Sequence, residues 1–502
     1  MNTKEYFRPF TAPEEFERII EKETVTEMWR DCVRDYADRE AIVYRESSCT
    51  FAQLEQAAAA FRAVLLRNVD GGRVGIFCAN STDFVKAFLA VTTLGMTAVI
   101  LPAHLDAHSV FGCCMLYKLN ALVYQPELEE KVAFAKEKLA ALPFIDITAS
   151  SEETADMRDC DASTPCVMMF TGGTTGKSKC ALLSNGAVMQ GTVNGCYGVP
   201  HVFYQRYLLV LPLSHVFGLI RNLMTSLYTG STLMICDNNK NMFRDIKTFK
   251  PTIMVMVPAL AEMSLSLSKQ FGRNMLGDDL KTIICGAAAV APYLIEEYDK
   301  LGVKLLQGYG LTESANLVSG NPVSVEYPDS IGYPYPNQEL RIVDGELWLR
   351  GKNMMDGYVG SDEDGFDSEG WFHTGDLVRQ DENGLLYITG RIKEIIVLPN
   401  GENISPAEVE GHFNALPFIQ DSQVFETVTE GGRHILALEV VPRQTVLGKL
   451  APEDPKAFIT AELEKVNQSL PSFQRVSKIT VRDSDFVRSP SMKIVRYKND
   501  KN

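Results

Sequence analysis

The sequence predicts an α/β protein built on doubly wound parallel sheets, followed by a smaller α+β unit. Between residues 24 and 124, apolar runs of strand length alternate with segments of helical length, a pattern typical of parallel strands covered by helices on both faces. From Ile331 the apolar runs become shorter and more β-like, and past residue 395 the chain has strands and helices of its own. A chain of 502 residues also exceeds what one hydrophobic core usually serves, so we expect at least two domains.

Local signals mark the expected elements. A helix is expected over 24–36, and Thr50 should cap a second one, with Gln53 three residues later completing a capping box. A third helix is expected from Asp83. The remaining expected elements are strands, each predicted by an apolar run of strand length. They cover residues 41–44, 74–78, 98–101, 122–124, 166–170, 252–257, 282–285 and 303–306, with more β-like runs at 340–343, 346–349 and 384–388.

Composition limits the function classes. The formal net charge of −15 argues against nucleic acid or an anionic membrane as the main partner. The N-terminus has no apolar signal core, and the longest apolar run, 87–103, is too short and too interrupted for a membrane span. Eleven cysteines are scattered without C-x-x-C spacing, as expected for buried thiols in a reducing compartment. We therefore expect a cytoplasmic protein.

The most informative stretch runs from Phe170 to Lys179 and reads FTGGTTGKSK. Its glycines let backbone N–H groups turn towards one centre, and its threonines and lysines add donors for a polyphosphate. The loop misses the G-x-x-x-x-G-K-[ST] motif because Thr171 stands in place of the first glycine. The run 181–183 predicts a strand, and Ser184 is the first helix-start signal. This indicates a strand–loop–strand phosphate clamp; the alternative is a glycine-rich surface hairpin.

Further candidates lie at the ends of expected strands. His215 stands between apolar runs, where a histidine is more often a core residue than a catalytic one. The small residues 286–288 could receive a flat ligand or allow close helix packing. Tyr309 lies between two glycines and is followed by Thr312 and Glu313. A ring, a hydroxyl and a carboxylate at one strand end suit stacking, phosphate contact and Mg²⁺ ligation.

In this order and at these separations, the motifs resemble those of the adenylate-forming superfamily, which includes acyl-CoA synthetases, luciferases and the adenylation domains of peptide synthetases. The resemblance spans residues 25 to 496, with six motifs in register from Thr171 to Arg496. It implies a large domain over 1–393, formed by doubly wound sheets and a distorted β-barrel subdomain. It also implies a small, mobile α+β C-terminal domain over 394–502.

The same resemblance implies a role for each nucleotide-facing residue. Tyr309 would stack on adenine, Thr312 would touch the phosphates, and Glu313 would ligate Mg²⁺. Asp376 would bind the ribose hydroxyls, with Arg391 as its basic companion. The residues expected around the phosphates and the other side of the purine are Thr171, Gly172, Gly173, Thr174, Thr175, Lys179, Gly286, Ala287 and Ala288.

The chemistry implied is the reaction of a carboxylic acid with ATP to give acyl-AMP and pyrophosphate, followed by attack of a thiol, with CoA as the expected acceptor. Lys493 would bridge the acyl carboxylate and the α-phosphate, and His215 would stand at the mouth of the acyl and pantetheine channels. The C-terminal domain would turn about Lys393 and Glu394. A positioned lysine and a metal ion suit this reaction because it brings two anions together.

Some residues depart from the family pattern. Gly172, Ser178 and Cys180 replace the usual serine, proline and glycine. The stretch 397–403 is most similar to that of long-chain fatty acyl-CoA synthetases. The stretch 214–218 lacks the aspartate that peptide-synthetase adenylation domains have beside the histidine motif, which disfavours an amino-acid substrate. We expect a fatty or other apolar acid as substrate. An aryl acid and an acyl carrier protein as acceptor are the near alternatives. An ATP phosphotransferase and a non-catalytic nucleotide-binding regulator are the more distant ones.

Overall fold

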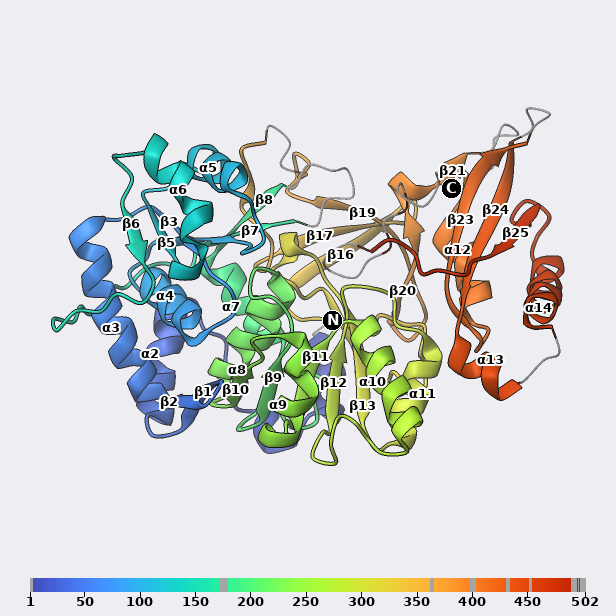
Figure 1. The fold of residues 1–502 in the computed structure, drawn as a ribbon, viewed down its shortest axis with the longest axis horizontal. Coiled ribbons are helices and arrows are strands. Elements are labelled where there is room, and N and C mark those ends of the chain that lie inside the picture. Colours follow the sequence, from blue (N-terminus) through green and yellow to red (C-terminus); the bar gives the residue numbers. More distant parts are fainter. Residues whose placement is uncertain are drawn as a thin grey trace.

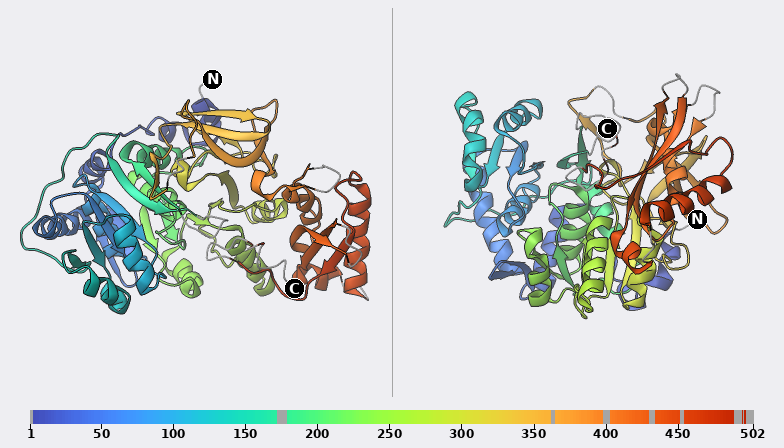
Figure 2. Two further views of the ribbon diagram at one scale, coloured as in Figure 1. Left: turned by 90° about the horizontal axis from the view of Figure 1, so that it is seen from above. Right: turned by 45° about the vertical axis from the view of Figure 1, so that its right-hand side comes forward.

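The computed structural model describes residues 3–171, 179–361, 365–397, 403–429, 434–450, 454–488, 494 and 496. The molecule consists of two large sheets with helices, a smaller antiparallel sheet and a separate C-terminal domain, and the strands of the two large sheets alternate along the chain (Figure 1). Figure 2 shows the C-terminal domain standing beside the rest of the molecule. The Lys493 position, glycine and threonine positions 172–175, and the expected turn at 399–401 lie outside the described residues.

The first sheet confirms the expected parallel, doubly wound arrangement. In the described chain its strand order is β18-β8-β7-β4-β3-β5-β6, parallel from β7 to β6. One face packs on the main core, and the other lies under α5 and α6. The elements are β3 (Arg73–Phe77), β4 (Thr97–Leu101), β5 (Ala121–Tyr124), β6 (Phe144–Asp146), β7 (Pro165–Phe170), β8 (Cys180–Ser184), β18 (Gly357–Val359), α3 (Phe51–Asn68), α4 (Thr82–Thr92), α5 (Ala107–Leu116) and α6 (Glu129–Lys138).

The second sheet has the order β15-β14-β13-β12-β11-β9-β10-β1-β2 among the described residues, and it is parallel from β13 to β1. Its strands are β1 (Glu40–Tyr44), β2 (Ser47–Thr50), β9 (Arg206–Leu209), β10 (Thr232–Ile235), β11 (Ile253–Met256), β12 (Thr282–Cys285), β13 (Lys304–Tyr309), β14 (Ser319–Asn321) and β15 (Tyr333–Pro334). The accompanying helices are α1 (Pro13–Phe16), α2 (Val25–Tyr36), α7 (Asn185–Asn194), the π-helix η4 (Phe217–Met224), α8 (Thr225–Tyr228), α9 (Met242–Phe249), α10 (Pro258–Phe271) and α11 (Pro292–Lys300).

Short-range sequence signals account for where several helices begin. The Thr50 side chain accepts the Gln53 N–H, and the Gln53 side chain accepts the Thr50 N–H, which confirms the capping box. Ser184 caps α7 directly after β8. β7 and β8 are antiparallel neighbours, so the strand–loop–strand prediction is confirmed and a P-loop, which opens a helix, is ruled out. The run expected at 384–388 begins only at Leu386, because Gly384 occupies a turn at φ +87°.

The expected β-barrel subdomain corresponds to an antiparallel sheet with the order β16-β17-β19-β20 in the described residues. The C-terminal domain that follows has its own sheet, β23-β24-β25, and its own hydrophobic core. The bounds are β16 (Gln338–Val343), β17 (Glu346–Gly351), β19 (Phe372–Gln380), β20 (Leu386–Arg391), β21 (Ile396–Val397), β22 (Asn403–Ile404), α12 (Pro406–Asn414), β23 (Ile419–Val428), β24 (His434–Pro442), α13 (Gln444–Leu450), α14 (Pro455–Ser469) and β25 (Lys478–Val481). Short 3-10 turns cover Thr3–Tyr6, Arg8–Phe10, Pro126–Leu128, Asn239–Asn241, Thr312–Ser314 and Ile392–Glu394.

The eleven cysteines are all free thiols, and most of them are buried. Burial is the main cause that raises the pKa of buried thiols such as Cys78 and Cys236, each to about 12. Within the described ranges, no helix combines the length and the apolar character that a membrane span requires.

Candidate active site

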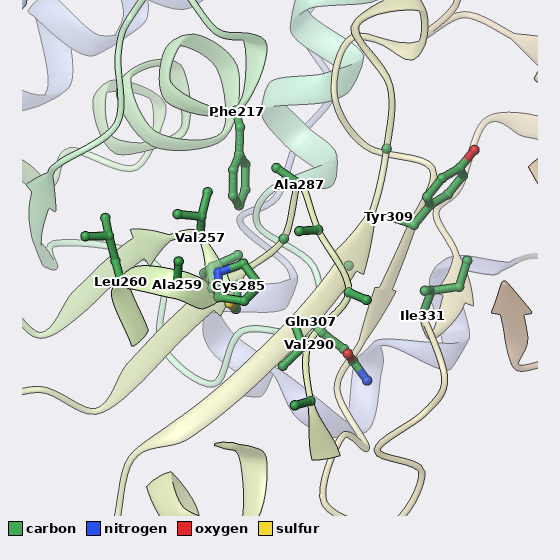
Figure 3. Close-up of a pocket in the computed structure, with 18 of the residues that line it drawn as sticks. Phe217, Val257, Ala259, Leu260, Cys285, Ala287, Val290, Gln307, Tyr309 and Ile331 are labelled. Carbon is green, nitrogen blue, oxygen red and sulfur yellow. The ribbon is translucent and has the colours of Figure 1, made fainter. Parts of the chain in front are cut away.

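One large cleft lies at the carboxyl ends of the second sheet's parallel strands and extends to the C-terminal domain. This end of a parallel sheet is where open α/β folds bind ligands. Figure 3 shows part of its wall, where Val257, Cys285 and Gln307 come from the ends of successive strands. Every described residue of the predicted nucleotide, acyl and hinge set lines this cleft: Thr171, Lys179, His215, Gly286, Ala287, Ala288, Tyr309, Thr312, Glu313, Asp376, Arg391, Lys393 and Glu394.

The first charged corner of the cleft is built around Asp376, whose side chain is 2% exposed. Its Oδ1 accepts a hydrogen bond from Arg391 Nε at 2.5 Å, and its Oδ2 accepts one from the Tyr309 hydroxyl at 2.5 Å. The register of β19 on β20 pairs Asp376 with Arg391, which explains a contact between residues far apart in sequence. Backbone bonds from Gly375 N–H to Glu346 and from Asp376 N–H to Thr374 fix the turn. The carboxylate is therefore held rigidly.

The protonation states in this corner follow from burial and charge. Burial, and next the negative charge of Asp376, raises the pKa of Tyr309 well above its usual value, so its hydroxyl stays a donor. Burial lowers the pKa of Arg391, but the Asp376 carboxylate outweighs it and the net pKa is raised. Near neutral pH, Asp376 therefore lies between the Arg391 cation and the neutral phenol of Tyr309.

The segment after β12 forms a wall of small residues. Ala287 has φ +66°, a left-handed conformation that is uncommon for a residue with a side chain. A Cβ on Gly286 would lie 3.3 Å from the Gly308 carbonyl oxygen and 3.4 Å from the Phe217 ring. In Figure 3, Phe217 approaches this segment, whereas Tyr309 extends from the end of β13 away from it. The cleft is thus narrow beside Phe217, and a flat group would fit against exposed backbone there.

The second charged corner joins Glu313 to the stem of the glycine-rich loop. Glu313 Oε1 accepts a hydrogen bond from the Tyr358 hydroxyl at 2.6 Å, and Lys179 Nζ lies 4.6 Å from the centre of the Tyr358 ring. Tyr358 is on β18, which pairs with β8 directly after the loop. The Thr171 N–H donates to the Lys179 carbonyl at 2.8 Å and closes the loop's stem. Sequence reasoning missed Tyr358 because its signal is a pairing between strands far apart in sequence.

His215 lies two residues before the π-helix η4 that borders the cleft. Its N–H donates to the Pro212 carbonyl, and its own carbonyl accepts from Leu219 N–H. A Cβ on Gly218 would lie 2.3 Å from the Pro212 oxygen, so this tight start requires glycine. The residue is half-buried and lines the cleft. No pattern in the sequence predicted a π-helix, a rare element that occurs frequently at functional sites.

The C-terminal domain reaches the same cleft through arginines. Arg443 Nε donates to Glu262 Oε1 on α10 at 2.6 Å, and its guanidinium lies 4.0 Å from the centre of the Tyr293 ring on α11. Arg496 makes a bidentate ion pair with Glu410 at 2.6 and 2.7 Å and lies 3.5 Å from Glu394. Arg496 thus anchors the chain three residues past position 493, on the hinge side of the C-terminal domain.

Metal-ligand candidates are few. No group of three or more His, Cys, Asp or Glu side chains that could hold a metal occurs in the part of the chain that the structure describes. Glu313 has a carboxylate of the hard oxygen type that Mg²⁺ prefers, and Mg²⁺ is usually held by one or two carboxylates together with substrate phosphates. The residues present therefore fit a metal that enters with a phosphate-bearing substrate.

A model of the AMP-binding enzyme family matches residues 29–359, and a model of the AMP-binding enzyme C-terminal domain matches residues 393–502. The chain belongs to the AMP-binding enzyme family. This confirms the resemblance drawn from the motifs. Within this AMP-binding enzyme the individual roles of the site residues remain predictions.

Curated relatives of this AMP-binding enzyme include the long-chain-fatty-acid–CoA ligase FadD15 of Mycobacterium bovis, 26% identical over an alignment of 553 positions that covers 90% of each protein. The indoleacetate–CoA ligase of Aromatoleum aromaticum is 33% identical over 296 residues, 56% of this chain and 58% of that protein. A solved structure of o-succinylbenzoate CoA synthetase from Bacillus subtilis has a TM-score of 0.77 at 24% identity and covers 95% of this chain and 98% of its own. That likeness confirms the predicted fold.

Proposed function

We propose that this protein is an AMP-forming acid–thiol ligase that converts a carboxylic acid to its acyl-adenylate and then to a CoA thioester. The observation that carries the proposal is the pair of charged corners across one cleft. Asp376 with Arg391 lies at one corner, and Glu313 lies beside the loop stem at Lys179. Two such corners suit the ribose and the triphosphate of ATP. The relatives named as CoA ligases support the same reaction.

Each corner has a defined task in the proposed first step. The rigid Asp376 carboxylate accepts hydrogen bonds from the ribose hydroxyls, and the small residues 286–288 and Tyr309 flank the purine. Thr171, Lys179 and Thr312 donate to the phosphates, as do residues 172–175 by their place in the motif. Glu313 would hold Mg²⁺, which would neutralise charge on the departing pyrophosphate.

In the first step a carboxylate oxygen of the acid attacks the α-phosphorus of ATP, and the bond to the bridging oxygen of pyrophosphate breaks. Lys493 is proposed to neutralise the two anions that meet there. In the second step the CoA thiol, losing its proton, attacks the acyl carbonyl and AMP leaves. His215, which lies just before the π-helix, is proposed to stand at the mouth of the channel through which both groups enter.

For the acid we propose an apolar body, fatty or aryl. The cleft beside the small-residue wall is lined by Phe217, Val257, Leu260 and Cys285 (Figure 3), which suits hydrocarbon. Relatives named for fatty and for aromatic acids both occur. We also propose a boundary near residues 393/394, because the C-terminal core is separate, and a cytoplasmic location, because free thiols are typical of a reducing compartment.

The test is pyrophosphate release measured against a panel of fatty and aryl acids, with and without CoA. Release that depends on the acid, followed by a CoA thioester in the products, is the expected result. Pyrophosphate release that does not depend on the added acid would indicate a phosphohydrolase. A stable acyl-adenylate with no thioester would contradict CoA as the acceptor.

A further inference from the structure

A buried arginine lies deep in the same cleft without a counter-ion. Arg221 belongs to the π-helix η4, is only 2% exposed, and is among the residues that line the cleft. Among the described residues it has no ion-pair partner, and its Nη1 has no hydrogen-bond partner. A guanidinium stays charged at any physiological pH. An uncompensated buried charge is strongly destabilising, so its retention requires an explanation.

The neighbours of Arg221 do not supply an anion. Burial raises the pKa of Tyr207, Tyr335 and Cys196 each to about 12, although the positive charge of Arg221 acts in the opposite direction. All three groups are therefore neutral near pH 7. The Tyr207 hydroxyl is itself buried without a hydrogen-bond partner. The arginine thus faces two phenols and a thiol, none of which balances its charge.

A second unpartnered donor lies close by in the fold. Ile220 and the Ala315 carbonyl both pack against Gly191 of α7, where a Cβ would lie 3.1 Å and 2.3 Å from them. The next residues along each segment are Arg221 and Asn316. Asn316 is 6% exposed, lines the cleft, and has its Nδ2 buried without a hydrogen-bond partner. Buried donors in folded proteins normally have hydrogen-bond partners. Two unpartnered donors on adjacent segments therefore indicate that the cleft binds a ligand with a hydrogen-bond acceptor.

We propose that Arg221 binds a second, distal carboxylate of the acid substrate, so that the enzyme acts on acids with an anionic group at each end. This inference rests on the proposed function and narrows its substrate class. Arg221 lies four residues past Phe217 in the same π-helix, so a short apolar spacer would separate the two carboxylates. The apolar wall then holds the spacer, and the arginine compensates the far charge by a bidentate contact.

The experiment compares a length series of α,ω-dicarboxylic acids with their monomethyl esters, which keep the size and one reactive carboxylate but lose the distal charge. Wild-type enzyme should show a kcat/KM for the best diacid on the order of 100-fold above that of its ester. In Arg221→Met the diacid-to-ester ratio should fall to about 1. A wild-type ratio near unity, or a ratio unchanged in the variant, overturns the proposal.

A matched control and a stability readout separate binding from structure. Arg206→Met removes a guanidinium that donates to the Phe249 carbonyl outside the cleft, and it should leave the ratio unchanged while lowering the melting temperature. Arg221→Met should leave the melting temperature of the free enzyme equal or higher, because an unpaired buried charge is removed. If that variant does not fold, Arg221→Lys provides the test. Its diacid-to-ester ratio should fall about tenfold, because lysine lacks the planar fork of arginine. A ratio equal to that of the wild type overturns the proposal.

Failure of the proposed function is distinguishable from failure of this inference. If no acid of either series releases pyrophosphate, the proposed ligase activity fails. Calorimetric titration of the diacid into wild-type and Arg221→Met protein then tests the site alone. Binding confined to the wild type supports the arginine site, whereas equal binding or none overturns it.

Discussion

Glu262→Gln tests whether the contact between the two domains sets the enzyme's working pose. Glu262 accepts from Arg443 Nε at 2.6 Å, and the two side chains are 27% and 9% exposed. A hydrogen bond between charged groups contributes about 1.5–3 kcal/mol when buried. Because Glu262 is partly exposed, we expect about 1.5 kcal/mol here, close to a tenfold change in an equilibrium constant. Glutamine keeps the shape and removes the charge.

The pose described by the structure brings the anchors on either side of position 493, Arg488 and Arg496, to the cleft that holds Asp376. In the proposed mechanism this pose would suit acyl-AMP formation, and the C-terminal domain would have to move away before a thiol could reach the acyl carbon. Glu262→Gln should lower the rate of acyl-AMP formation relative to thioester formation by about tenfold.

Single-turnover assays measure the two steps separately, with acid plus ATP in one and synthetic acyl-AMP plus CoA in the other. Glu297→Gln is the matched control, because Glu297 pairs with Lys269 and Lys300 inside the large domain on the same wall of the cleft. The control should leave the ratio of the two rates unchanged. Equal slowing of both steps in Glu262→Gln would refute the idea that this contact selects a pose.

Four further outcomes are expected. Glu313→Gln and Asp376→Asn should each lower ATP–pyrophosphate exchange by about 100-fold with the fold retained, since each removes about 3 kcal/mol of electrostatic stabilisation; near-normal exchange in either would contradict its role. Lys493→Ala should slow adenylation severely but spare thioester formation from preformed acyl-AMP, so equal damage to both would make it a structural residue. EDTA should abolish turnover and Mg²⁺ should restore it, whereas inactivation by a zinc-selective chelator in excess Mg²⁺ would reveal a missed site. Gly310→Ala should destabilise the protein by about 3 kcal/mol or more in denaturant unfolding, because its Cβ would lie 1.2 Å from the backbone carbonyl oxygen of Asn316. An unchanged unfolding midpoint would show that this turn can shift.

The sequence was informative wherever structure depends on neighbours along the chain. Thr50 with Gln53 and Ser184 are caps whose partners stand three residues away, so the helix starts could be predicted. The signal for the strand after the glycine-rich loop was also local, because it lies in a short apolar run. The predicted strand distinguishes this loop from a P-loop, and the structure shows that it pairs antiparallel with β7.

Contacts between residues that lie far apart in the sequence could not be predicted in the same way. Tyr358 meets Glu313 from another sheet, and Arg443 meets Glu262 from another domain, so no spacing in the sequence signals either pair. The lack of a counter-ion for Arg221 is even harder to predict, because an arginine in an apolar run looks the same in the sequence whether or not it has a partner in the fold. Motif resemblance indicated which residues belong together, whereas burial and geometry show what each one touches.

The buried thiols have a chemical consequence for an enzyme proposed to handle an activated acyl group. Cys78, Cys236 and Cys285 all line the cleft, yet burial raises the pKa of each, to about 12 for the first two. At pH 7 a thiol with a pKa of 12 is ionised in only about one molecule in 10⁵, against about 3% for an ordinary thiol. Since the thiolate is the nucleophile, the protein's own cysteines compete poorly with an incoming thiol. The enzyme is thereby protected against acylating itself.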